Sequence, residues 1–136
     1  MDYSDYDKYF EEKGIMHYEK DGAMNKELWE SAPIKILFVL KETAGYDNCP
    51  VFFLKDAIEK EWLPDKNRTY TKIAKLALFL QKSFDKESSL TKEECKKLDK
   101  NHDILFKALE HCAVINIKKT SNKIMRSNKN VILKNF

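Results

Sequence analysis

Two short apolar runs, residues 36–40 and 113–117, each end abruptly in polar residues. Nearly continuous apolar sequence is typical of strands that are buried on both faces, so the pattern predicts a parallel sheet with helices on both sides. Parallel strands place their carboxyl ends at one edge of the sheet, which is where ligands bind in open α/β folds. The polar residues that follow the two runs are therefore expected to line one cleft.

Helices are predicted for much of the remaining chain. Aromatic residues recur at near-helical spacing over residues 3–13, which indicates an amphipathic helix. Residues 14–22 are predicted to be irregular, and Asn25 is placed to cap a short helix that ends before Pro33. Pro50 suits the first turn of a further helix, whose predicted buried residues are Phe53, Leu54, Ala57, Ile58 and Trp62.

Two more helices lead to the second apolar run. Apolar residues three and four positions apart predict a helix, whose buried face comprises Tyr70, Ile73, Ala74, Ala77, Leu80 and Phe84. Thr91 and Glu94 have the spacing of a capping box, which marks the start of the next helix. That helix is expected to break near residues 99–103 and to resume before residue 113.

The order strand, helices, strand predicts a right-handed parallel crossover. We therefore expect a single domain over residues 1–136 with an α/β fold, in which helices cover a short parallel sheet. Two strands make a poor sheet, which leaves three explanations open. Further strands lie in segments assigned above as helical or irregular, or the chain is a fragment with an incomplete sheet, or a protein partner or a second copy in a homo-oligomer completes the sheet.

Composition narrows the class of protein. The chain is 43% hydrophobic and 35% charged, which is typical of a globular domain, and no apolar stretch approaches the roughly 20 residues of a membrane helix. The acidic N-terminus lacks the features of a secretion signal, so a cytoplasmic location is expected. The three cysteines are widely spaced without a CxxC pair, and no histidine pair has metal-ligand spacing, so neither a metal nor a disulfide framework is expected.

The loop after the first apolar run carries candidate chemistry. Glu42 or Asp47 can orient or deprotonate a water, and Tyr46 can stack on a ring. Gly45 allows the backbone to approach a ligand, and Lys41 is a candidate phosphate ligand. The alternative is an ordinary solvated loop in which an acidic or amide side chain only caps the next helix.

Asn116 is the unusual residue of the second run, because an amide inside an apolar strand must find hydrogen-bond partners. At the end of a strand it can present a donor and an acceptor to a nucleobase edge, or neighbouring backbone can satisfy it. Lys118, Lys119 and Thr120 follow as candidate phosphate ligands. Residues 118–136 contain basic residues and no acidic residue, which suits either phosphate contact or a solvated tail. The chain has no glycine-rich phosphate loop, so nucleoside triphosphate binding is not expected.

Residues 36–45 resemble the first motif of the uracil-DNA glycosylase superfamily, in which a strand runs into Gly-Glu-Ala-Pro-Gly. Glu42 and Gly45 match that motif, whereas the residues at 41, 43 and 44 depart from it. Residues 114–120 are similar to the family's second strand motif, and Asn116 and Lys118 match its asparagine and lysine. The likeness covers about residues 34–122.

The resemblance implies a three-layer α/β/α fold around a short parallel sheet. It also implies binding of DNA with an extruded base and hydrolysis of the N-glycosidic bond. It implies that the loop of Glu42 contacts the sugar and places the attacking water, that Asn116 reads the base edge, and that Lys118 and Lys119 hold phosphate. Members with an iron–sulfur cluster carry four cysteines that this chain does not reproduce, so no cofactor is expected. The family continues with further strands and a histidine-containing loop, so the chain is expected to lack its carboxyl-terminal part.

Three functions remain open at this point. The first is a DNA glycosylase, with Glu42 and Asp47 as its catalytic residues and Tyr46 and Asn116 as its base-binding residues. The second is a nucleic-acid-binding module of the same fold without turnover. The third is a protein-interaction module whose sheet another chain completes.

Overall fold

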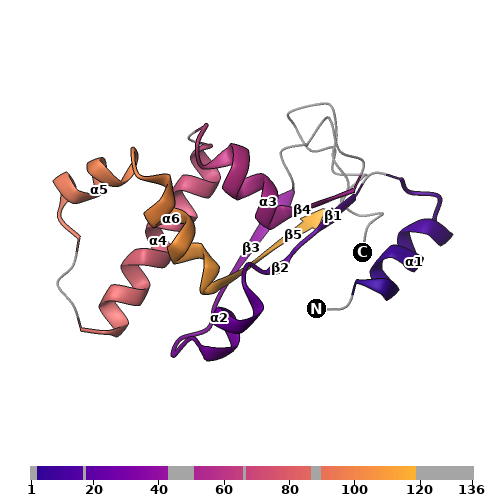
Figure 1. Ribbon diagram of the computed structural model, residues 1–136, viewed down its shortest axis with the longest axis horizontal. Helices are drawn as coiled ribbons and strands as arrows, with labels where there is room; N and C mark the ends of the chain where they lie inside the picture. The colour runs from indigo at the N-terminus through magenta and orange to yellow at the C-terminus, as the bar shows by residue number, and fades with distance from the viewer. Residues whose placement is uncertain (1–2, 17, 43–50, 66, 87–89, 119–136) are drawn as a thin grey trace.

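The computed structural model describes residues 3–16, 18–42, 51–65, 67–86 and 90–118 (Figure 1). Most of the strands lie in the first half of these residues, and a run of helices separates them from the last strand. In chain order they are α1 (Ser4–Glu12), β1 (Tyr18–Lys20), β2 (Gly22–Ala23), α2 (Lys26–Ser31), β3 (Ile36–Glu42), β4 (Val51–Phe53), α3 (Leu54–Ala57), the π-helical segment η1 (Ile58–Trp62), α4 (Arg68–Phe84), α5 (Lys92–Leu98), α6 (His102–Glu110) and β5 (Cys112–Lys118).

The two apolar runs form neighbouring parallel strands, as predicted. In the register of β3 and β5, Leu40 lies opposite Asn116 and Glu42 lies opposite Lys118. Strand β2 pairs with the other side of β5 in the antiparallel direction, which gives the order β2-β5-β3. The carboxyl ends of β3 and β5 therefore share one edge of the sheet.

A second, two-stranded sheet occupies segments for which the sequence pattern predicted no strand. Strands β1 and β4 pair in parallel, and only Asp21 separates β1 from β2 along the chain. The predicted irregular stretch therefore contains a strand, and the helix predicted to begin at Pro50 begins only at Leu54. Of the three explanations for a sheet of only two predicted strands, further strands in segments predicted as irregular or helical therefore account for part.

Alternation of side chains explains why residues 51–53 form a strand rather than a helical turn. Phe52 is 7% exposed and packs in the core, whereas Phe53 is 45% exposed, so the prediction that Phe53 is buried is wrong. A period of two places neighbouring residues on opposite faces of a strand, whereas neighbours in a helix lie only about 100° apart around the axis. The prediction of a buried Trp62 on the following helix is confirmed.

The α/β class is confirmed, and Figure 1 shows α3 to α6 gathered on one side of the strands and α1 on the other. On β3, Ile36 is buried against the core and Phe38 packs beside it, whereas Leu37 and Val39 are 53% and 55% exposed. The expectation that both faces are buried is therefore wrong for β3. Among the described residues, α1 covers the second face near β1, where Phe10 stacks on Tyr18.

Helix ends follow the capping signals in the sequence. The Asn25 side chain accepts a hydrogen bond from Leu28 N, and Thr91 and Glu94 form the predicted capping box. The predicted break falls between α5 and α6, and Asn101 caps α6 there. The buried face of α4 is confirmed at Tyr70, Ile73, Ala74 and Ala77, whereas Phe84 is exposed at the last residue of the helix. Among the described residues, none of the helices has the length and apolar character needed to span a bilayer.

The packing yields a first prediction. Ile58 is 0% exposed in the core, whereas Ile104 on α6 is 42% exposed. Ile58→Ala should lower the free energy of unfolding by about 2–5 kcal/mol, because the cavity it leaves adds to the lost apolar burial. Ile104→Ala, the same chemical change at an exposed site, should cost about 1 kcal/mol or less. Urea denaturation followed by circular dichroism measures both values, and equal losses would contradict the burial of Ile58 in the core.

Candidate functional site

Asn116 is the centre of a buried polar cluster near the end of β5. Its side chain is on the core face of the strand and the residue is 1% exposed. Its Nδ2 atom donates a hydrogen bond to Glu19 Oε1 at 2.6 Å, and its backbone N–H donates to Asp21 Oδ2 at 2.6 Å. The alternative in which neighbouring backbone satisfies the Nδ2 group is therefore wrong, since the partner is a carboxylate from β1.

Both carboxylates of this cluster are buried. Glu19 is 0% exposed and Asp21 is 9% exposed. Removing a carboxylate from water costs several kcal/mol unless hydrogen bonds or charges compensate it. The two donors on Asn116 supply part of that compensation, so β1 and β5 depend on each other for their polar groups.

Two tyrosines from different helices lie within the electrostatic field of these carboxylates. Burial raises the pKa of Tyr6, on α1, and the charges of Asp21 and Glu19 raise it further. Burial also raises the pKa of Tyr70, on α4, and the charge of Glu19 adds to this, whereas a hydrogen bond from the Asn116 side chain acts in the opposite direction. Both phenols therefore stay protonated at neutral pH, and neither can act as a base there.

The amide oxygen of Asn116 is a further polar atom of this cluster. The Oδ1 atom of Asn116 is buried and accepts no hydrogen bond within the part of the chain that the structure describes. A buried acceptor without a partner costs about 1–3 kcal/mol. A ligand that donates an N–H to this oxygen would recover that energy, which makes the Asn116 amide the best candidate for a ligand-binding group.

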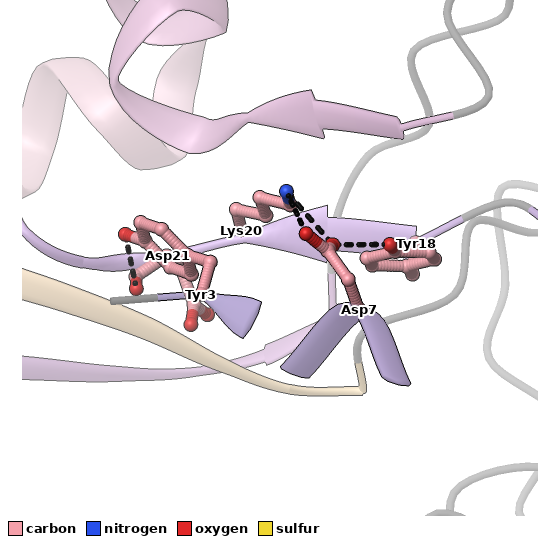
Figure 2. Close-up of polar contacts among 5 residues, drawn as sticks. All are labelled: Tyr3, Asp7, Tyr18, Lys20 and Asp21. Atoms are coloured by element: carbon pink, nitrogen blue, oxygen red, sulfur yellow. Dashed lines mark hydrogen bonds and ion pairs between the residues drawn. The ribbon is translucent and has the colours of Figure 1, made fainter. Parts of the chain in front are cut away.

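Helix α1 contacts β1 through the side chains of Tyr18 and Lys20, as Figure 2 shows. The Asp7 carboxylate accepts hydrogen bonds from the Tyr18 hydroxyl and from Lys20 Nζ, the latter at 2.9 Å. The Tyr3 hydroxyl donates to the backbone oxygen of Asp21 at 3.2 Å. Because Tyr18 and Lys20 flank Glu19, these contacts fix the strand that carries the buried carboxylate.

A cavity of about 250 Å³ lies beside this helix, and Tyr3, Lys20, Asp21 and Phe53 contribute to its walls. The Lys20 ammonium lies 5.5 Å from the Tyr3 ring centroid and 5.3 Å from that of Phe53. It also forms an ion pair with Asp7. Its charge is therefore already matched within the protein, which disfavours this cavity as a phosphate site.

The predicted site residues fall into three groups. Asn116 is buried at the predicted edge, and the backbones of Glu42 and Lys118 lie opposite each other there, although their side chains are outside the description. Lys41 is exposed and, by alternation along β3, leaves the sheet on the face of Leu37 and Val39, away from Asn116. The remaining predicted residues, Tyr46, Asp47, Lys119 and Thr120, lie outside the described residues.

Glu19 and Asp21 are the residues that sequence reasoning missed. They belong to a short, charged stretch between two glycines, and acidic residues are seldom fully buried, so exposure was the natural expectation. The available signal was Asn116 itself, because a polar residue in an apolar strand requires a partner on a neighbouring element. The sequence does not show which element supplies that partner.

The buried thiol is not a candidate nucleophile. Cys112 is 0% exposed at the start of β5, and burial raises the pKa of its thiol to about 11, although a hydrogen bond from Gln81 acts in the opposite direction. The thiolate is the reactive form of cysteine. Cys112 is therefore protonated at neutral pH and contributes to packing.

Comparison with family models, with curated proteins and with solved structures finds no match to this chain. The resemblance to the uracil-DNA glycosylase superfamily therefore remains a prediction that rests on the two strand motifs. What the structure adds is the register between those motifs and the polar cluster around Asn116.

The contacts of α1 yield a second prediction, on pH dependence. Hydrogen bonds from Lys20 and Tyr18 hold the pKa of Asp7 below its usual value. A lowered folded-state pKa adds stability above the unfolded-state pKa, and this contribution disappears as the pH falls through the folded-state value. The melting temperature of wild-type protein should therefore exceed that of Asp7→Asn at pH 7, and the difference should close below about pH 4.

Thermal melts at several pH values test this expectation. Asp65→Asn, which changes an exposed carboxylate after η1, is the matched control. A difference between wild type and Asp7→Asn that stays constant from pH 7 to pH 3 would show that Asp7 does not hold α1 through its charge.

Proposed function

We propose that this protein binds nucleic acid and hydrolyses the N-glycosidic bond of a base that is turned out of the helix into the shared edge of β3 and β5. The observation that carries the proposal is the Asn116 amide, which a carboxylate holds in place while its Oδ1 atom is left without a partner among the described residues. Turning out a base costs a few kcal/mol, which edge hydrogen bonds and stacking in a pocket repay.

The strand register supports the assignment of roles. Glu42 lies at the end of β3, two positions beyond the residue opposite Asn116, so a base at the amide places its sugar toward the loop that follows Glu42. Hydrolysis adds water to the anomeric carbon, and the bond electrons leave with the base. The developing positive charge on the sugar is stabilised by a carboxylate, for which Glu42 and Asp47 are the candidates. Tyr46 is the candidate for stacking on the base.

The hydrogen-bonding character of Asn116 favours one class of base. Its Nδ2 group is hydrogen-bonded to Glu19, whereas Oδ1 is a buried acceptor without a partner among the described residues. An acceptor pairs with a base whose ring nitrogen carries a hydrogen, as in uracil or hypoxanthine, and not with cytosine, whose corresponding nitrogen is itself an acceptor. A site that is built to accept a hydrogen bond from a substrate N–H rejects analogues that lack this N–H.

The third prediction concerns base release. Oligonucleotides that carry a single uracil or hypoxanthine, single- or double-stranded, should lose that base on incubation with the protein, and alkaline strand cleavage reports the loss. Asn116→Ala and Glu42→Ala should each reduce the rate by about 100-fold or more, since each removes a group that stabilises the transition state. Glu93→Ala makes the same change as Glu42→Ala at an exposed position of the distant helix α5 and should leave the rate unchanged.

The outcomes separate the candidate functions. Undiminished excision in both site variants would show that the site is assigned wrongly. Nucleic-acid binding without release of any base by the wild-type protein would replace the enzyme by a binding module of the same fold.

The fourth prediction concerns phosphate binding by the residues that end β5 and follow it. Replacing Lys118 and Lys119 with glutamine should weaken DNA binding for every sequence and lower the slope of log affinity against log salt by about one for each lost contact. Fluorescence anisotropy at several salt concentrations measures both. Replacing Lys92 and Lys96, which are exposed on α5, removes the same charge elsewhere. An equal loss of affinity in that control would indicate only a general effect of net charge.

A further inference from the structure

We infer that Glu19 is a positioning residue, which fixes the orientation of the Asn116 amide and thereby sets which bases the site accepts. The inference rests on the proposed function, because it names the residue that controls selectivity at that same site. Glu19 does not contact the base in this arrangement and acts only through Asn116.

The first step of the argument is the chemistry of the contact. An ionised carboxylate can only accept hydrogen bonds, whereas an amide carries a donor on one side and an acceptor on the other. The 2.6 Å distance from Asn116 Nδ2 to Glu19 Oε1 therefore requires the amide nitrogen to face β1. Rotating the amide by half a turn would bring Oδ1 against the carboxylate, which places two acceptors in contact.

The second step is that the protein occupies the donors of Asn116 on all sides. Its backbone N–H is bound to Asp21 Oδ2 at 2.6 Å, and its side chain also forms a hydrogen bond to Tyr70. The bonds to the Glu19 and Asp21 carboxylates are charge-assisted, and such bonds are about twice as strong as neutral ones. What remains for a ligand is the Oδ1 atom, a pure acceptor at a fixed position.

The third step concerns access to the alternative orientation. Tyr70 is 2% exposed and Glu19 is 0% exposed, so the described residues leave little water in the cluster to reward a rotated amide. A neutral glutamine at position 19 would change this, because its own amide can donate to Oδ1. The Asn116 amide could then turn and present its nitrogen, a donor, to the base. Selectivity for bases with a ring N–H would be lost without any change in the residue that touches them.

The experiment compares wild type with Glu19→Gln on matched oligonucleotides that carry uracil or cytosine at one position. We expect the ratio of kcat/KM for uracil over cytosine to fall by about tenfold or more in the variant, which corresponds to one charge-assisted hydrogen bond. Glu94→Gln makes the same change in the α5 capping box, where the side chain also accepts hydrogen bonds, and should leave the ratio unchanged. Circular dichroism checks that each variant folds.

A measurement on the wild-type protein keeps the inference testable if Glu19→Gln does not fold. The side-chain amide of Asn116 is the pair of resonances that disappears from the ¹H–¹⁵N spectrum in Asn116→Asp. Held by Glu19, this amide should resonate outside the range of solvated asparagines and exchange slowly with water. An amide pair at solvated positions with fast exchange would overturn the role of Glu19.

Failure of the inference and failure of the proposed function give different results. A folded Glu19→Gln variant that releases uracil with the wild-type preference over cytosine would overturn the positioning role and leave the glycosylase proposal standing. A wild-type protein that releases no base from any substrate would overturn the proposed function, and the inference about selectivity would fall with it.

Discussion

The hydrogen bond between Asn116 and Glu19 is the constraint on which the arrangement of this molecule depends. It joins β5 to β1 across 97 positions of sequence, in a region where both residues are withdrawn from water. An unmatched buried carboxylate or amide would cost more than a single hydrogen bond gains. The two strands must therefore meet in one relative position, and the second contact, from the Asn116 backbone to Asp21, fixes the same position independently.

Helix α1 and the sheet depend on each other for the same reason. Strand β1 has three residues, too few to be stable by pairing alone, and its sequence is largely charged. Asp7 binds Tyr18 and Lys20 on one face, while Glu19 reaches Asn116 on the other. Alternation along the strand thus converts a polar sequence into two separate sets of contacts, one with α1 and one with the core.

The predictable and the unpredictable parts of this fold differ in the range of the interactions that determine them. The helix starts at Asn25 and Thr91, the buried face of α4 and the parallel pairing of β3 with β5 could be predicted, because capping and periodicity depend on residues close in sequence. Strands β1 and β4 could not, since each has only three residues and forms by pairing with the other. Asn116 could be identified as a candidate site residue, but its partner Glu19 could not, because only the tertiary fold brings β1 to β5.

The cluster around Asn116 is not what stability alone would select. Buried polar and ionic groups can often be replaced by apolar residues of similar volume without loss of stability, and sometimes with a gain. An apolar residue occupies the neighbouring position on this face, since Val114 lies two residues before Asn116 on β5 and is fully buried. The change from valine to asparagine along that face coincides with the approach to the edge where β3 and β5 end together. A fixed amide with an unpartnered acceptor suits the recognition of a ligand at that edge. The burial of the Glu19 carboxylate is the energetic cost of holding this amide in one orientation.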